Sequence, residues 1–275
     1  MEYKKAHLNK HYNNHWLTRF VPNYNPLGLP PYTIRVLLKP NFTPAFSKPS
    51  TQVSVEPNIW DVTYVNNNWN HDLLSSPYDA REKIYEVLGA NTENITCMSS
   101  MLEDCTAMSS VELFDTSKVT NMYEMFQNCD SLSSVPLYNT SNVSSMECMF
   151  DNCINLRDVP LLDTKNVVTM KNLFSYCKKI ETLPLLDTSN VTSMYQMCLT
   201  CSSLKSIPLF NTNKVSNMDG TFESCYSVNN GALALYNQVS TQANPPTNHY
   251  STFASCGRDS QTGSAELAQI PASWK

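Results

Sequence analysis

Apolar and polar positions recur along most of this chain with a fixed period of 24 residues. The segment 119–129 (VTNMYEMFQNC) recurs with substitutions as VSSMECMFDNC from Val143 and as VVTMKNLFSYC from Val167. The cysteines of this pattern are Cys105, Cys129, Cys153, Cys177, Cys201 and Cys225. A fixed period of about 20 to 50 residues is typical of repeat proteins, in which each unit buries its apolar face against the next.

The first half of each repeat predicts a short helix. Val119, Met122, Phe126 and Cys129 stand at positions i, i+3, i+7 and i+10, which lie on one face of an α-helix. Because so short a helix is not stable alone, we expect its apolar face to be buried by the rest of the repeat.

The second half of each repeat predicts a short strand and a turn. Val135 and Leu137 are separated by one residue, the period of a strand, and Pro136 between them removes a backbone donor. We therefore expect very short parallel segments rather than central strands of an antiparallel sheet. Next comes Asp or Asn followed by Thr, as at Asn139 and Thr140. These side chains can close a turn or cap a helix, which we favour over a row of calcium ligands because each repeat offers only one such group.

These patterns predict an α/β solenoid, a leucine-rich-repeat-like right-handed coil of short parallel strands and short helices with a β-rich N-terminal cap. The motif C-x-x-L-x-x-V-P-L-x-D-T-S-x-V-T-x-M-x-x-M-F, across roughly residues 84–271, resembles the repeats of the BspA-like surface proteins, the group with mycoplasma-type lipoprotein repeats. The resemblance implies a curved solenoid used for adhesion or recognition, with no catalytic residues to transfer. Similar repeat proteins occur in crAss-like phages of gut Bacteroidales.

Composition divides the chain into four parts. We predict an attachment arm (1–31), a β-rich N-terminal cap (32–83), the repeats (84–228) and a C-terminal cap with an atypical last repeat (229–275). The N-terminal cap contains YTIRVLL and TQVSVEPNIWDVTYV, which are rich in β-branched and aromatic residues. In the C-terminal cap, Phe253 repeats Phe222 at a spacing of 31 instead of 24.

The arm is basic and aromatic, whereas the rest of the chain is acidic. Its three histidines share one side of a helix, if a helix forms; metal binding is conceivable there, but a solvated or interface face is the commoner use of such histidines. The arm either binds a partner or folds back onto its own chain. The candidate attachment residues are Lys4, Lys5, His7, His11, His15, Trp16, Arg19 and Phe20.

Charge and cysteine content exclude several classes of protein. A net charge of −5 and a pI near 5.5 predict no nucleic-acid partner. No apolar run approaches the roughly 18 residues of a membrane span, and residues 1–30 have no apolar core of a secretory signal. We expect the ten cysteines to be reduced and mostly buried. Cys198 and Cys201 form C-x-x-C, but a zinc site would need a second pair.

Two series of residues are candidates for a recognition face. One series follows the predicted strand and either forms an exposed hydrophobic stripe or turns inward to pack the corner of the repeat. It comprises Phe114, Tyr138, Leu162, Leu186 and Phe210. The other series is small and polar, is expected to face solvent, and comprises Ser110, Ser134, Asp158, Thr182 and Ser206.

No motif of catalysis or phosphate binding is present, so we expect no enzyme activity and no cofactor. The leading hypothesis is a bacteriophage virion protein (tail, fibre or capsid-decorating) that binds other virion proteins through its arm and a host surface protein or glycan through its repeats. The alternatives are a bacterial cell-surface adhesin and an intracellular scaffold for protein partners.

Overall fold

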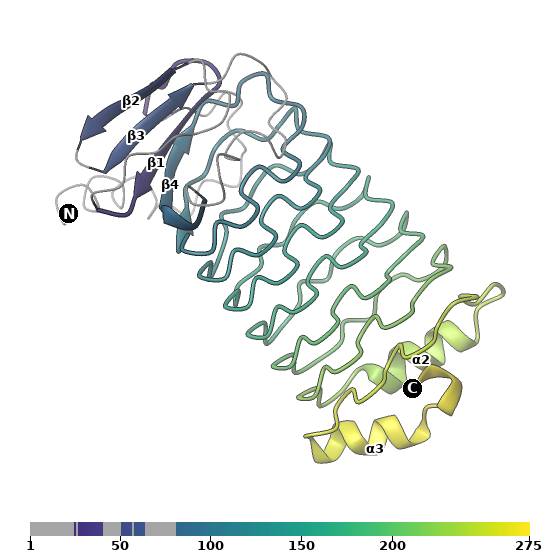
Figure 1. Ribbon diagram of the computed structural model, residues 1–275. Coiled ribbons are helices and arrows are strands. Elements are labelled where there is room, and N and C mark those ends of the chain that lie inside the picture. The colour runs from purple at the N-terminus through teal and green to yellow at the C-terminus, as the bar shows by residue number, and fades with distance from the viewer. Residues whose placement is uncertain (1–24, 26, 41–50, 57, 64–80) are drawn as a thin grey trace, which may run out of the picture.

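The computed structural model describes residues 25, 27–40, 51–56, 58–63 and 81–275. A five-stranded sheet lies at the N-terminal end and two α-helices lie at the opposite end, with the repeats between them (Figure 1). The strands are β1 (Thr33–Leu38), β2 (Thr51–Glu56), β3 (Ile59–Thr63), β4 (Ile84–Ala90) and β5 (Ser110–Val111). The helices are α2 (Ala232–Ser240) and α3 (Gln261–Gln269), and short 3₁₀ turns span Arg81–Lys83 and Ala272–Trp274.

The sheet is mixed and mostly antiparallel, with strand order β2-β3-β1-β4-β5. Only β4 and β5 pair in parallel, through Glu86 with Ser110 and Val87 with Val111. In β1 the side chains of Ile34, Val36 and Leu38 are buried, as the alternation of a half-buried strand requires. These strands confirm the β-structure expected in YTIRVLL and TQVSVEPNIWDVTYV, as far as the described residues extend.

Residues 91–228, which we call the repeat stack, join this sheet to the helices. Successive repeats lie side by side, and single parallel bridges link residues 24 positions apart, such as Asn121 with Ser145 and Ser145 with Thr169. Beside these bridges the amide of Ser144 donates to Thr120 O at 2.9 Å. Further backbone hydrogen bonds join each repeat to its neighbour, among them Met122 N to Ser145 O and Asn128 N to Asp151 O, both at 2.9 Å.

The predicted α/β solenoid of short parallel strands and short helices is wrong. Between β5 and α2, a range that the structure describes completely, there is no helix, and extended backbone is limited to isolated bridges. The regular structure of the described residues is the mixed sheet and the two short terminal α-helices.

The backbone explains why the expected helix does not form. In an α-helix the amide of Phe126 would bond to the carbonyl of Met122, but it donates instead to Met149 O of the next repeat at 2.9 Å. The residues Glu124 and Asn128 have φ angles of 55° and 60°, in the left-handed region that interrupts a right-handed helix. The same two positions are left-handed in the other repeats, so the segment is a succession of tight turns.

The apolar face that suggested a helix is nevertheless the core. Val119, Met122, Phe126 and Cys129 are all fully buried. The rings of Phe126, Phe150 and Phe174 stack with centroid distances of 5.6 and 5.7 Å and interplanar angles of 0° and 5°. The spacing of apolar residues therefore predicts which side chains are buried although it predicts the wrong backbone.

Polar side chains complete the contacts between repeats. The buried hydroxyl of Thr164 donates to Asp187 O of the next repeat at 2.8 Å, and the thiol of Cys153 donates to Phe126 O of the previous repeat at 3.0 Å. The same contacts recur at Thr116, Thr140 and Thr188, and at Cys129, Cys177, Cys201 and Cys225. Each repeat thus donates to both neighbours. The threonine hydroxyls satisfy carbonyl groups in the turns, whereas the thiol of Cys153 is a second donor to Phe126 O, which also accepts the amide of Cys129 at 3.1 Å.

The last repeat and the terminal helices cover the C-terminal end of the core. Asn217 bridges to Asn248 across the predicted spacing of 31, and the ring of Phe253 stacks on Phe222 at 6.1 Å. Trp274 then lies against Phe253 with a centroid distance of 6.3 Å. In α2 the buried residues are Ala232, Leu235 and Val239, which form its inner face.

Candidate interaction surface

Four leucines form an exposed row along the repeat stack, one in each of four successive repeats. Leu137, Leu161, Leu185 and Leu209 are 43, 63, 64 and 55% exposed, and we call this row the leucine ridge. The equivalent residue nearer the sheet, Leu113, is partly buried against the core, so the ridge ends before the sheet begins. Large exposed apolar side chains at a regular spacing are the mark of an interaction surface.

A tight turn turns two of the ridge leucines outward. In a strand, Val135 and Leu137 would point to the same side of the backbone. Val135 is buried but Leu137 is exposed. In two later repeats the backbone bends at this point, because the amide of Leu186 donates to Pro184 O, and the amide of Phe210 to Pro208 O, both at 3.0 Å. Each is the hydrogen bond of a three-residue γ-turn, and its central residue, Leu185 or Leu209, points to solvent.

The first candidate series lies in the core and not on the surface. Phe114, Tyr138, Leu162, Leu186 and Phe210 are each at most 3% exposed. The rings of Phe114 and Tyr138 are 5.0 Å apart, and burial raises the pKa of Tyr138 well above its ordinary value. An exposed stripe formed by this series is therefore wrong, and its residues pack the corner of each repeat, which was the alternative.

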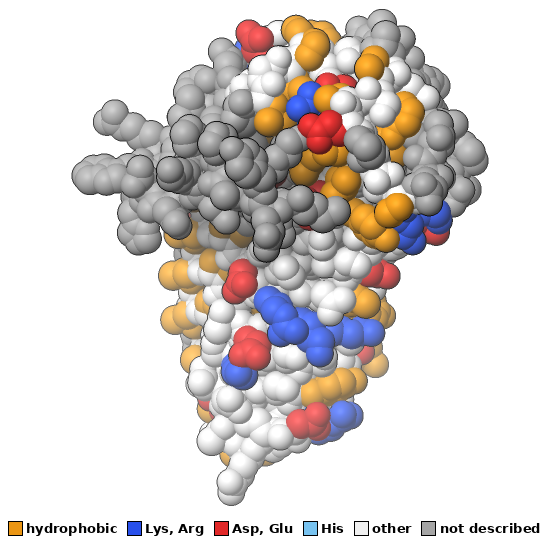
Figure 2. All heavy atoms as spheres, turned by 90° about the vertical axis from the view of Figure 1, so that its left-hand side faces the viewer, with side chains coloured by type: hydrophobic (Ala, Val, Ile, Leu, Met, Phe, Trp, Pro, Cys, Tyr) orange, Lys and Arg blue, Asp and Glu red, His pale blue; other side chains and the backbone are white. Residues whose placement is uncertain are grey.

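The second candidate series lies on the surface, three residues before the ridge position in each repeat. Ser110, Ser134, Asp158 and Thr182 are exposed and Ser206 is half-buried. In the same part of the repeats, Lys205 forms an ion pair with Glu181, and this hydrogen bond lowers the pKa of the Glu181 carboxyl. Figure 2 shows lysine and arginine side chains gathered on one side of the stack with acidic side chains among them.

The predicted attachment residues lie outside the described residues. This applies to Lys4, Lys5, His7, His11, His15, Trp16, Arg19 and Phe20. The end of the arm is described and folds back onto the chain: Leu29 is buried and its carbonyl accepts a hydrogen bond from Nδ2 of Asn91 at 2.8 Å.

The metal alternatives find no support in the described part of the chain. Among those residues, no group of three or more His, Cys, Asp or Glu side chains is arranged to hold a metal ion. Asp187 closes a turn, as expected for the Asx series: its side-chain oxygen accepts the amide of Ser189 at 2.9 Å. Cys198 and Cys201 are fully buried, and all ten cysteines are free thiols.

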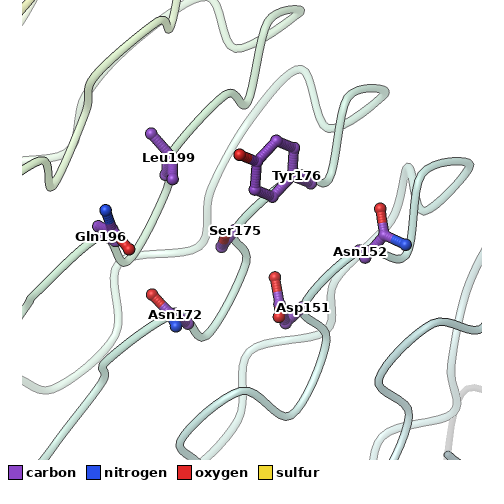
Figure 3. A pocket seen from close by; sticks show the side chains of 7 residues that line it. All are labelled: Asp151, Asn152, Asn172, Ser175, Tyr176, Gln196 and Leu199. Carbon is purple, nitrogen blue, oxygen red and sulfur yellow. The ribbon is translucent and has the colours of Figure 1, made fainter.

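A pocket of about 420 Å³ opens on the turn-forming half of three successive repeats (Figure 3). Its lining combines one carboxylate, three amides, a hydroxyl, an aromatic ring and an aliphatic side chain. The lining residues are Asp151, Asn152, Asn172, Ser175, Tyr176, Gln196 and Leu199. Its polar character and small size suit a small uncharged ligand better than a protein surface.

Sequence reasoning missed both features. The strand-like spacing of Val135 and Leu137 predicts that both side chains lie on the same side of the backbone, and only Pro136 between them indicates a bend. The pocket lies where the repeat pattern changes: Tyr176 occupies the position that Asn128 and Asn152 hold in the preceding repeats. Comparing each repeat with its neighbours, position by position, would have drawn attention to Tyr176.

Comparison with known proteins gives one family. The family model described as "Mycoplasma protein of unknown function, DUF285" matches residues 71–182 and 152–258. No curated protein matches the chain. Among the described residues, no helix has the length and apolar character needed to cross a membrane.

Proposed function

The chain belongs to the family described as "Mycoplasma protein of unknown function, DUF285", and on that premise we propose that it is a non-enzymatic recognition protein that binds another protein through the leucine ridge. The observation that carries the proposal is the row of four exposed leucines, two of which, Leu185 and Leu209, are the central residues of a turn that begins at the preceding proline. Full burial of one leucine side chain stabilises an association by about 1.5 to 3 kcal/mol. Four such side chains in a row supply the apolar centre that a specific interface needs.

The spacing of the ridge indicates the kind of partner. Parallel bridges join adjacent repeats, which places them about 4.8 Å apart, close to the rise of one helical turn. An α-helix advances about 5.4 Å per turn. A helix lying along the ridge therefore brings one apolar side chain per turn against each leucine, so an amphipathic helix is the partner element that fits.

For its location we propose a bacteriophage virion, in a tail, fibre or capsid-decorating position. Two observations support this: the resemblance to repeat proteins of Bacteroidales phages, and the basic N-terminal arm in an otherwise acidic chain. The arm would attach the protein to other virion proteins and the repeats would remain available for binding. Deletion of residues 1–31 is expected to abolish incorporation into particles while the repeats stay folded.

A bacterial cell-surface adhesin is the second candidate, because the family description names Mycoplasma, a bacterium. Mass spectrometry of gradient-purified material separates the two. Stoichiometric peptides in particle fractions support the virion location, whereas peptides confined to cell-envelope fractions contradict it and support the adhesin.

The ridge itself is tested by site-specific photocrosslinking in that source material. A benzophenone amino acid replaces Leu161 in one sample and Val168 in a second sample. Val168 is a matched control because it is also an exposed apolar residue, 49% exposed, outside the ridge. We expect a discrete crosslinked protein from position 161 alone. Equal crosslinking at both positions, or none at position 161, would contradict the proposal.

A further inference from the structure

A ladder of amide side chains runs toward the pocket and stops there. The Nδ2 group of Asn128 donates to Asp104 Oδ1 at 2.8 Å, and the Nδ2 group of Asn152 donates to Asn128 Oδ1 at 3.0 Å. Continuing the ladder would require an amide at position 176, but the residue there is Tyr176. The last amide of the ladder, Asn152, therefore lines the pocket instead of bonding to a further repeat.

One side-chain oxygen in the lining of the pocket has no hydrogen-bond partner among the described residues. The Oδ1 atom of Asn172 is buried and accepts no hydrogen bond from the residues that the structure describes. A buried acceptor without a donor costs about 1 to 3 kcal/mol, so such an atom in a pocket points to a donor supplied from outside. A hydroxyl or an amide N–H of a ligand meets this need.

The remaining lining offers the apolar surface and the hydrogen-bond acceptor that a sugar ring requires. Tyr176 is 41% exposed and offers an aromatic ring, and Leu199 adds apolar surface. The carboxylate of Asp151 accepts a hydrogen bond from Gln127 at 2.8 Å, which fixes its position. Burial raises the pKa of Asp151, while hydrogen bonds from Gln127 and Ser175 oppose that shift. A fixed carboxylate accepts hydrogen bonds from hydroxyl groups and repels an anion.

We propose that this pocket binds a neutral sugar residue of a glycan. The volume of about 420 Å³ lies at the small end of ligand pockets and suits a single saccharide unit. The ring of Tyr176 contacts the C–H face of the sugar. The oxygens of Asp151 and Asn172 accept hydrogen bonds from its hydroxyl groups. Sugar binding here is a function separate from protein binding at the leucine ridge.

The test is saturation-transfer NMR of the full chain with N-acetylglucosamine, N-acetylgalactosamine, galactose, glucose and mannose, and with N-acetylneuraminic acid as an anionic probe. We expect at least one neutral sugar to bind with a dissociation constant on the order of millimolar, the range of weak small-ligand binding. The anionic sugar is expected to bind at least about tenfold more weakly because the carboxylate repels it. If none of the neutral sugars binds, or if N-acetylneuraminic acid binds best, the proposal is overturned.

The decisive variant is Tyr176→Asn. Asparagine tolerates the left-handed backbone at this position, where φ is 57°, and it matches the two preceding repeats. The variant should therefore fold, extend the amide ladder and lose at least about tenfold in sugar affinity. Asp151→Asn should weaken binding as well. Tyr250→Ala removes an exposed tyrosine near the C-terminal end and should leave affinity unchanged. Wild-type affinity in Tyr176→Asn would refute the assignment.

The leucine ridge provides an independent control. Leu161→Asp is expected to leave sugar binding intact, because position 161 does not line the pocket. Loss of sugar binding in Leu161→Asp alone would refute the separate pocket. The NMR experiment can thus refute sugar binding without affecting the ridge proposal, and the photocrosslinking experiment can refute protein binding without affecting the pocket.

Discussion

The N-terminal sheet and the repeat stack hold neighbouring backbone segments together in different ways. In the sheet, β1 pairs with β3 over five consecutive residues, Thr33 to Leu37, and backbone hydrogen bonds hold the strands. In the stack, backbone hydrogen bonds such as Phe126 N to Met149 O at 2.9 Å also join neighbouring repeats, but they lie in tight turns, and side chains such as Thr164 and Cys153 add further hydrogen bonds. Stability in the sheet therefore depends on apolar alternation, whereas the stack also depends on the identity of individual polar residues.

This difference makes the stack the more sensitive region to small changes in chemistry. A strand accepts many residues of suitable size because its backbone makes the bonds. A repeat whose threonine is replaced leaves a carbonyl of its neighbour, such as Asp187 O, without its hydroxyl donor. Replacing a cysteine removes one of two donors, because Phe126 O also accepts the amide of Cys129. Four predictions test this comparison.

The largest effect is expected from Phe150→Ala. Phe150 is fully buried between Phe126 and Phe174, and removing a buried phenylalanine side chain costs about 3 to 5 kcal/mol. Chemical denaturation measures the change in the free energy of unfolding. Val168→Ala is the control and should change it by less than about 0.5 kcal/mol, because Val168 is exposed. A loss below 1 kcal/mol for Phe150→Ala would contradict the observed core.

Thr164→Val tests the polar contacts between repeats. Valine keeps the shape of threonine but removes the hydroxyl that donates to Asp187 O at 2.8 Å. The unpaired carbonyl is expected to cost about 1 to 3 kcal/mol in the free energy of unfolding. Thr182→Val makes the same change at an exposed position and should cost less than about 0.5 kcal/mol. Equal losses in the free energy of unfolding at the two sites would contradict the proposed dependence of the stack on individual polar residues.

Buried thiols predict a loss of stability at alkaline pH. Burial raises the pKa of the Cys148 thiol from 9.0 to about 11. Between these values the unfolded chain ionises while the folded chain keeps the proton. The folded state then binds more protons, so stability falls as pH rises above about 9, and the contribution of Cys148 to this fall is complete near pH 11. Denaturation midpoints measured across this range should fall less in Cys148→Ser than in the wild type; an identical fall would exclude a contribution from Cys148.

The smallest effect on stability is expected from Leu161→Asp in the leucine ridge. The side chain is 63% exposed, so the free energy of unfolding should change by less than about 0.5 kcal/mol. Association with the protein partner should nevertheless be lost, because a charge replaces an apolar contact. Pull-down of the protein that crosslinks to position 161 measures this loss. A variant that unfolds more easily but still retains that protein would show that Leu161 serves the core instead.

The sequence predicted the buried residues of the stack better than it predicted the backbone. Val119, Met122, Phe126 and Cys129 have the spacing of a helical face, but two turns with left-handed residues place the same side chains on one side. Asn128 favours that backbone conformation, whereas Glu124 does so much less, so the signal was incomplete. The alternation in β1 had a single interpretation, and the strand was predicted correctly.

The candidate surfaces were harder to predict because both depend on local bends. Leu185 faces solvent only because of the turn formed by Pro184 and Leu186, which no periodicity reveals. Tyr176 lines a pocket because it ends a ladder of side-chain amides, a contact between residues 24 positions apart. The polar series that includes Ser134 and Asp158 was placed correctly on the surface.

Because the contacts between repeats are uniform, the number of repeats sets the length of this protein. Because each repeat presents the same donors and acceptors to its neighbours, a 24-residue unit can be inserted or removed without altering the contacts at either end. Each insertion would separate the sheet from the terminal helices by one further step of about 4.8 Å. It would also add one leucine to the ridge. Repeat number therefore sets both the reach of the molecule and the length of the helix that it can accommodate.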